Sequence, residues 1–440
     1  MKRTSEPLPP FEFLAAVIHY RLQTELTEDT PKFPTYEPEK FDDSSISRFI
    51  KKTNLPQTET IVLLLALVPH LLPGFLSSIL ATYFPDGGEL PEFGGIKGTH
   101  YRGIFPTGET VLYILAGTHI QQRIEVSSIF EAQHVFKKNN IVSLDKPIHG
   151  EPAMSGRLVL DEEYLFWITK EKVVHPELSE KFPAQRITTQ LEWDDLILDM
   201  ETMDHIREIE TWLHYEKELK TDWDMGKRIK PGYRVMFYGA PGTGKTLTAT
   251  LLGKHTGKDV YRIDLSMVVS KFIGETEKNL ANLFNKAENK NWILFFDEAD
   301  AIFGKRTETR DAHDKYANQE VSYLLQRIEN YSGLVILASN FKKNIDTAFT
   351  RRFQSIIEFK NPDTKERLAL WKHNIPEKAS LAEDIDLNNI ATNYDITGSN
   401  IVNAIQYASI QTIAKKTTII SREDLLKGIK KEFIKEGRMM

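Results

Sequence analysis

The chain has 440 residues, 41% hydrophobic and 27% charged, the composition of an ordinary globular protein with room for two or three domains. The net charge of −6 argues against a general nucleic-acid-binding protein, so we expect no nucleic-acid partner. The absence of cysteine excludes disulfides and thiolate metal sites. The first residues, MKRTSEPLPP, lack the apolar run of a signal peptide, and we expect a cytoplasmic protein.

Residues 1–187 are expected to form a mixed, mainly helical N-terminal domain. Apolar clusters at residues 11–20 and 61–72 indicate helices. Residues 86–108 are rich in glycine and indicate a long loop, and residues 110–116 form a short apolar element after it. This part of the chain contains no chemical motif.

Residues 61–84 carry no charged side chain and are long enough to span a bilayer. However, Pro69, Pro73 and Gly74 interrupt the stretch, where they would break a spanning helix. We therefore expect two shorter buried helices joined at residues 70–74, and a membrane is an unlikely partner.

Short apolar runs alternate with helical patterns across residues 188–360. Each run has four to six residues rich in strand-forming side chains, as expected of a parallel sheet flanked by helices. The segment therefore predicts a three-layer α/β domain. The runs are residues 234–238, 259–264, 292–297, 334–339 and 355–359.

Residues 361–440 are expected to form a small all-helical domain, because strand-like runs stop there. Asp363, Ser399 and Ser421 each precede a helical pattern and are candidate N-caps. Ser421 with Asp424 also resembles a capping box.

Residues 239–246, GAPGTGKT, fit the phosphate-binding pattern G-x-x-x-x-G-K-[ST] between a predicted strand and a predicted helix at residues 245–255. In that position, backbone N–H groups and the helix N-terminus converge on phosphate oxygens. Lys245 would reach the outer phosphates, and the Thr246 hydroxyl would bind Mg²⁺. The candidate nucleotide-binding residues here are Gly239, Pro241, Gly242, Thr243, Gly244, Lys245, Thr246 and Leu247.

The apolar strand at residues 292–297 ends in carboxylates. Asp297 is placed to hold Mg²⁺ and Glu298 to orient the attacking water. An acidic helix N-terminus would explain one carboxylate, and Asp300 suits that simpler role.

Two further sites follow downstream. Asn340 ends the strand at residues 334–339, where its amide can contact a γ-phosphate or the attacking water, although an asparagine there can also start a turn. Arg351 and Arg352 precede the last strand; arginines there can pair with surface carboxylates or stabilise charge on a neighbouring subunit's nucleotide.

In this order, the elements from about residue 191 to the C-terminus resemble the AAA family of P-loop ATPases. GAPGTGKT resembles its Walker A motif, ILFFDEADAIFGKR its Walker B motif and ILASN its first sensor. IDTAFTRRF resembles its second region of homology, and GSNI at residues 398–401 resembles the lid motif that contacts adenosine.

The resemblance implies ATP and Mg²⁺ as ligands, and a homo-oligomeric ring, usually a hexamer, with nucleotide at subunit interfaces. It implies catalytic roles for Lys245, Glu298 and Asn340, and nucleotide contacts from Asp195, Leu196, Gly398 and Ser399.

The arginines depart from the family pattern. Its two spaced arginines are reduced here to the adjacent pair Arg351 and Arg352, of which Arg352 is the better finger candidate because a phenylalanine follows it.

Phe272, Ile273 and Gly274 resemble the family's central-pore loop, where an aromatic side chain gives sequence-tolerant contact with a polypeptide. Alternatively, Phe272 and Ile273 pack under the following helix.

These features favour a ring ATPase that remodels, threads or disassembles a protein client held by the N-terminal domain and the pore loop. The alternative is an ATP-switched assembly factor or scaffold with little threading. A DNA loader or helicase is disfavoured by the charge. Residues 98–117 are also similar to a segment of AAA proteins encoded with phage-tail-like contractile injection particles, which would make a particle component the client.

Overall fold

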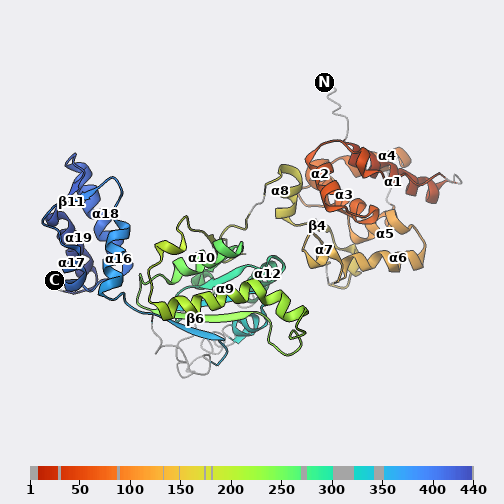
Figure 1. The fold of residues 1–440 in the computed structure, drawn as a ribbon. Coiled ribbons are helices and arrows are strands. Elements are labelled where there is room, and N and C mark those ends of the chain that lie inside the picture. The colour runs from red at the N-terminus through yellow and green to blue at the C-terminus, as the bar shows by residue number, and fades with distance from the viewer. Residues whose placement is uncertain are drawn as a thin grey trace, which may run out of the picture. The chain divides into compact units, whose positions relative to one another are not determined.

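The computed structural model of this chain divides into two compact units, Met1–His175 and Pro176–Met440. Both units are drawn in Figure 1. The residues that the structure describes are 8–27, 31–86, 90–131, 133–147, 149–172, 175–179, 182–268, 275–300, 322–340 and 351–438.

The first unit is mainly helical. Its core surrounds α3, whose residues 60–68 are all buried and which contacts α1 and α5. The segment expected as a loop at residues 86–108 contains a short antiparallel pair, β1 (Ile96–Lys97) with β2 (Ile104–Phe105), and β3 (Val142–Leu144) pairs with β4 (Leu158–Leu160). The helices are α1 (Pro9–Leu26), α2 (Ser45–Thr53), α3 (Gln57–Leu71), α4 (Phe75–Tyr83), α5 (Gly108–Ala116), α6 (Ile120–Ser127), α7 (Val135–Lys138) and α8 (Glu162–Lys170).

Within the described ranges, no single helix is long and apolar enough to cross a membrane. Together α3 and α4 reach the necessary length and composition, but the chain bends by 105° between them. The predicted break between two helices is therefore confirmed, but Pro69 lies inside α3 rather than at the break, and α4 buries only Leu76 and Ile79. The break lies where Pro73 and Gly74 separate the two helices.

The second unit contains a six-stranded sheet with the order β10-β6-β9-β8-β7-β5. The five predicted strands are present and mutually parallel. The sheet is nevertheless mixed rather than parallel throughout, because β5 pairs antiparallel with β7 at its edge. The strands are β5 (Ala184–Ile187), β6 (Tyr233–Gly239), β7 (Val260–Ile263), β8 (Ile293–Phe296), β9 (Leu334–Ser339) and β10 (Ser355–Phe359).

Alternate side chains of the strands enter two separate cores, one on each face of the sheet. Val235 and Phe237 of β6 pack with α9 (Met200–Thr221) and α10 (Lys245–Thr256). Met236 packs on the opposite face with α12 (Glu275–Lys290) and with helical residues 322–330. This period of two is what a strand buried on both faces requires.

Residues after β10 form the lid, a small domain of helices α16 (Thr364–Asn374), α17 (Leu387–Asn393), α18 (Gly398–Ala414) and α19 (Arg422–Lys435). It is not all-helical, because β11 (Ser380–Leu381) and β12 (Ile419–Ile420) form a two-residue parallel pair.

The predicted helix caps of the lid are confirmed at two of three positions. Asp363 caps α16 and Ser421 caps α19. The prediction for Ser399 is wrong: Thr397 precedes the first residue of α18, and Ser399 lies inside the first turn.

The division between the units falls before β5 rather than between residues 187 and 188. The reason is the ladder of β5, in which Ala184 pairs with Ile263 and Ile187 with Val260. Strand pairing attaches this segment to the second unit.

Candidate functional site

The phosphate loop is the turn that joins β6 to α10. Gly239 ends β6 and Lys245 begins α10. Gly242 and Gly244 have φ angles of 78° and 104°, left-handed values that residues with a side chain rarely adopt. The first N–H groups of a helix lack intrahelical acceptors and carry positive partial charge. The turn and the helix start together therefore suit an anionic ligand.

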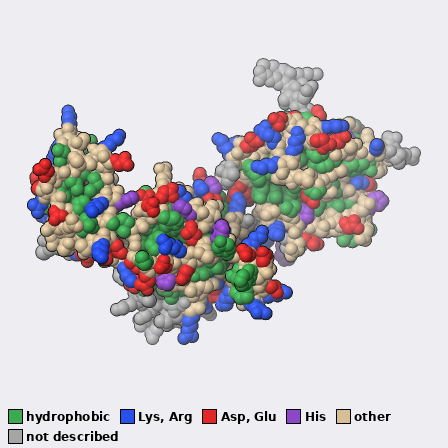
Figure 2. Space-filling model, viewed as in Figure 1, with side chains coloured by type: hydrophobic (Ala, Val, Ile, Leu, Met, Phe, Trp, Pro, Cys, Tyr) green, Lys and Arg blue, Asp and Glu red, His purple; other side chains and the backbone are tan. Residues whose placement is uncertain are grey.

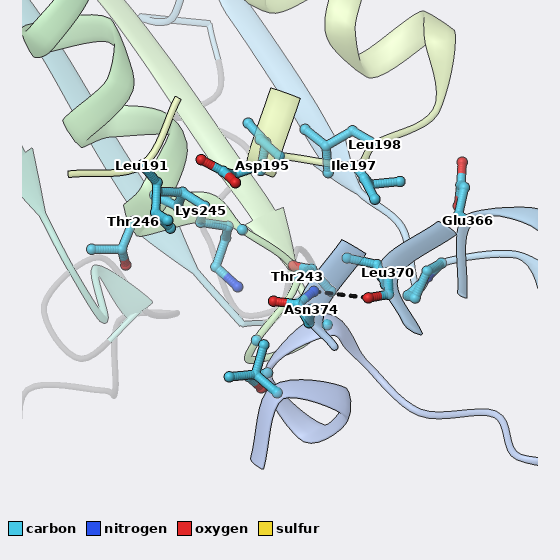
Figure 3. Close-up of a pocket in the computed structure, with 18 of the residues that line it drawn as sticks. Leu191, Asp195, Ile197, Leu198, Thr243, Lys245, Thr246, Glu366, Leu370 and Asn374 are labelled. Atoms are coloured by element: carbon cyan, nitrogen blue, oxygen red, sulfur yellow. Dashed lines mark hydrogen bonds between the residues drawn. The ribbon is translucent and has the colours of Figure 1, made fainter. Parts of the chain in front are cut away.

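Lys245 is buried at the base of this loop, with 7% of its surface exposed. Its Nζ donates to the carbonyl oxygens of Gly239 (2.7 Å) and Ala240 (2.9 Å). Burial lowers the pKa of Lys245, and the nearby carboxylates of Asp297 and Asp300 act in the opposite direction. Figure 3 shows the amino group reaching into the space between the phosphate loop and the lid.

Carboxylates follow β8, as predicted. Asp297 accepts a hydrogen bond from the backbone N–H of Glu298 (3.0 Å), and Glu298 has a left-handed φ of 51° and an exposed side chain. Asp300 instead accepts from the Ser339 hydroxyl (3.0 Å), which ties the end of β8 to the end of β9. Asp300 thus has a structural role, whereas Asp297 and Glu298 line the cavity beside the phosphate loop.

Asn340 follows β9, the strand between β6 and β8. Its Oδ1 accepts a hydrogen bond from Lys245 Nζ (3.3 Å). The carboxyl ends of parallel strands meet at one edge of a sheet, and three such ends bring Lys245, Asp297 and Asn340 together here.

These residues share one cavity of about 720 Å³, a size typical of a small-molecule site. Its walls are the phosphate loop, the segment 191–199 and the lid. The predicted site residues in its lining are Asp195, Leu196, Pro241, Gly242, Thr243, Gly244, Lys245, Thr246, Leu247, Asp297, Glu298, Asn340, Gly398 and Ser399. Gly239 lies outside the lining but contacts Lys245.

Among the described residues, hydrogen bonds join the lid to the rest of the site at two places, and Ile197 packs against the lid core. The backbone N–H of Ser399 donates to the carbonyl of Gly242 (3.2 Å). At the other end of the cavity, His373 Nε2 lies 2.6 Å from Asp195 Oδ1. The backbone N–H of Glu192 and His373 together lower the pKa of Asp195.

The contribution of α16 to the cavity wall was not predicted from the sequence. His373 and Asn374 line the cavity, and Figure 3 shows the Asn374 Nδ2 donating to Leu370 O (2.9 Å). No spacing marks these residues along the chain. Their position depends on how the lid folds back over the phosphate loop.

Comparison with known proteins agrees with this geometry. Residues 235–361 match the family described as ATPase family associated with various cellular activities (AAA). These residues form an AAA ATPase domain. Such a domain binds ATP with Mg²⁺ and hydrolyses the nucleotide.

The chain is also similar to a 26S proteasome regulatory subunit 6B homolog of Dictyostelium discoideum. The two are 31% identical over 210 residues, which cover 46% of this chain and 52% of the relative. The chain thus spans about half the length of this curated relative. Residues 98–117 lie outside the AAA match, and the relative is a proteasome subunit by its description, so neither finding supports the resemblance to contractile injection particles.

The donors around the AAA cavity fit MgATP. Thr246 offers a hydroxyl and Asp297 a carboxylate, the oxygen ligands that Mg²⁺ prefers. Those two residues would hold the ion, which would neutralise phosphate charge. The apolar side chains of Leu196, Ile197 and Leu370 line the cavity and suit the flat faces of a nucleobase.

Arg351 and Arg352 are not among the cavity residues. They precede β10, which runs parallel to β6, so they lie at the amino edge of the sheet while the phosphate loop lies at the carboxyl edge. The five residues of β10 alone separate the two edges by roughly 16 Å. Arg352 forms an ion pair with Glu329, and Arg351 is exposed.

The pore-loop candidates Phe272, Ile273 and Gly274 lie outside the described residues.

Proposed function

We propose that this chain is an ATP-driven motor that works as a homo-oligomeric ring, hexameric in the usual AAA manner, and remodels a protein client. The observation that carries the proposal is the single cavity joining Lys245, Asp297, Glu298 and Asn340 to the lid. A site closed by a separate small domain can convert nucleotide turnover into movement of that domain.

Each residue has a chemical task in this proposal. Lys245 and the loop N–H groups bind the phosphates, and Lys245 counters charge that develops on the γ-phosphate. Glu298 orients water and accepts its proton, while Asn340 positions that water or the γ-phosphate. The hydrogen bond from Lys245 to Asn340 supports joint action, because both side chains meet at one point of the cavity.

The arginine pair supports a shared site. Arg351 and Arg352 are too far from the cavity of their own subunit to contact its nucleotide, as judged by the length of β10. In a ring they would face the nucleotide of a neighbouring copy, where an arginine stabilises charge in the transition state. Arg352, the finger candidate favoured by the sequence, forms an ion pair with Glu329, and this pair favours Arg351 instead as the arginine that reaches across, with Arg352 as its support.

The client is expected to be a protein. The net charge of −6 is unsuited to general nucleic-acid binding. On the face drawn in Figure 2, among the described residues, acidic and basic side chains are interspersed rather than gathered into one basic area. Similarity to a proteasome regulatory subunit is consistent with work on polypeptides. The client would bind through the first unit and through Phe272 of the pore loop.

ATPase assays on mixed rings test the shared site. Arg351→Ala and Glu298→Gln should each lose nearly all hydrolysis while binding ATP, and mixing the two proteins should restore some activity. Arg352→Ala should lower stability as well as activity, because it leaves Glu329 without its cation. If no mixing ratio restores activity, the proposed action between subunits is wrong.

Client remodelling needs its own assay. Wild-type protein with ATP should unfold or dissociate a client recovered on the Glu298→Gln variant, and Phe272→Ala should abolish that work while leaving basal ATPase unchanged. Ring formation that responds to ATP, with no remodelling of any captured client, would indicate an assembly factor instead.

A further inference from the structure

A buried polar network lies inside the lid, between α18 and α19. Glu432 is 5% exposed, and Asn400 and Thr397 are each 7% exposed. A buried carboxylate is costly unless hydrogen bonds and an opposite charge compensate it. Here Lys435 Nζ donates to Glu432 Oε1 (2.5 Å), and Asn403 Nδ2 donates to Oε2 (3.2 Å).

Asn400 connects this carboxylate to the start of α18. Its Nδ2 donates to Glu432 Oε2 (3.2 Å) and to Glu436 Oε1 (3.1 Å). Its Oδ1 accepts a hydrogen bond from the Thr397 hydroxyl. Both ends of the Asn400 amide are therefore fixed, which sets the position of the first turn of α18.

The first turn of α18 in turn touches the phosphate loop. The Thr397 and Ser399 hydroxyl oxygens lie 3.2 Å apart, and the Ser399 N–H donates to Gly242 O (3.2 Å). The approach is so close that a Cβ on Gly242 would lie 1.8 Å from Ser399 Oγ and 2.8 Å from Thr397 Oγ1. Contacts are thus continuous from α19 to the loop that binds phosphate.

We propose that Glu432 is a positioning residue for the nucleotide site, acting through Asn400 and Thr397 on the turn that packs against Gly242. The inference rests on the proposed ATP site. Without the carboxylate, the Asn400 amide lacks its main buried acceptor, the turn is no longer fixed, and Gly398 and Ser399 shift where they line the cavity. The effect is on nucleotide binding more than on the hydrolysis step, because Glu432 touches no reacting group.

The same helix offers a matched control. Asp424 of α19 is 4% exposed and is bound by Lys415 Nζ (2.5 Å) and the Ser421 hydroxyl (2.7 Å). It is thus a second buried carboxylate paired with a lysine, but its bonds run to the end of α18 and the start of α19 rather than toward the phosphate loop. Loss of either carboxylate weakens the lid. Only Glu432 is connected to Gly242.

The experiment compares full-length Glu432→Leu, Glu432→Gln, Thr397→Val and Asp424→Leu. Steady-state ATPase gives KM and kcat, a fluorescent ADP analogue gives Kd, and urea unfolding gives stability. We expect Glu432→Leu and Thr397→Val to raise KM and Kd roughly tenfold with kcat within about twofold, the size of one or two lost hydrogen bonds. Glu432→Gln should recover much of the affinity, because its amide oxygen still accepts from Asn400.

Asp424→Leu should reduce stability as much as Glu432→Leu while KM and Kd stay within about twofold of wild type. Equal rises in KM for these two variants would overturn the positioning role and leave a purely structural one. Thr397→Val is a second test in case the Glu432 variants do not fold, since it removes the hydrogen bond from Thr397 to Asn400 without removing a charge. Unchanged nucleotide affinity in a folded Thr397→Val protein would also refute the inference. Failure of the wild type to bind the ADP analogue at all would instead reject the proposed ATP site.

Discussion

Replacing Gly242 by alanine should separate the lid from the phosphate loop. The new Cβ would lie 1.8 Å from Ser399 Oγ, whereas ordinary contact needs about 3.4 Å. The Ser399 hydroxyl can rotate away, but Ser399 Cβ and Thr397 Oγ1, each 2.8 Å from the new Cβ, would push the first turn of α18 back by about 0.6 Å. A retreat of that size breaks the 3.2 Å hydrogen bond from Ser399 N–H to Gly242 O.

Two costs of this change can be distinguished by whether they depend on bound nucleotide. Alanine at the left-handed φ of Gly242 destabilises the folded protein by roughly 1–2 kcal/mol whether or not nucleotide is bound. The lost lid contact weakens binding by about 1–1.5 kcal/mol, the value of a hydrogen bond to a buried partner. Since about 1.4 kcal/mol is a factor of ten, we expect nucleotide affinity to fall roughly tenfold.

Binding of a fluorescent ADP analogue measures this loss, and two controls isolate its cause. Gly257→Ala places alanine at a φ of 65° with no atom within 4 Å of the new Cβ, so it should share the loss of stability but retain wild-type affinity. Adding Ser399→Gly to Gly242→Ala removes the two clashing atoms of Ser399, leaves Thr397 Oγ1 at 2.8 Å, and should restore part of the affinity. Wild-type affinity in Gly242→Ala, or no rescue by Ser399→Gly, would show that this contact does not support binding.

Four other variants have expected outcomes. Lys245→Ala should abolish nucleotide binding in the ADP-analogue assay. Glu298→Gln should retain binding but lose at least a hundredfold in the rate of ATP hydrolysis, the usual contribution of a general base. Comparable hydrolysis rates for Glu298→Gln and wild type would exclude that role. Lys415 and Ser421 lower the pKa of Asp424, so its stabilising contribution exists above the unfolded-state pKa and is lost as pH falls through the lower folded-state pKa. In Asp424→Asn, the free energy of unfolding measured with urea should accordingly fall less steeply as the pH is lowered. An acid-side slope equal to that of wild type would contradict this. Phe182 packs on the Tyr261 and Trp292 rings, so Phe182→Ala should cost about 3–5 kcal/mol in unfolding free energy, and a loss below 1 kcal/mol would refute its place in the ATPase core.

Residue pattern was sufficient to predict the central strands and the phosphate loop. The central strands β6, β8 and β9 are largely apolar runs buried on both faces, whereas β7 and β10 each carry one exposed charged residue, Arg262 and Glu358. All five runs still stand out from the helical patterns between them. The polar residues that follow these runs, such as Asp297 and Asn340, could be placed together because parallel strands end at one edge. The structure confirms that they share a cavity.

Other features could not be predicted because their determinants are tertiary. In β5 only Ala184 is buried, while Gln185 and Arg186 are exposed, so no apolar run marks an edge strand. The pair β11–β12 has two residues in each strand, too short for any periodicity. His373 and Asn374 join the cavity only because α16 folds over the phosphate loop.

The attachment of β5 has a mechanical consequence. The chain that leaves the first unit enters the ATPase sheet through this strand, and Pro183 O also accepts from Asp264 N–H at the end of β7 (3.0 Å). Tension between a client held by the first unit and the ATPase domain would therefore be distributed over the hydrogen bonds between β5 and β7. It would not be carried by a single unpaired segment of chain. Pulling at the first unit would strain β7, and β7 leads through residues 264–268 toward the segment that contains Phe272. Force on the first unit would then reach the residues that follow β7 through one continuous stretch of backbone.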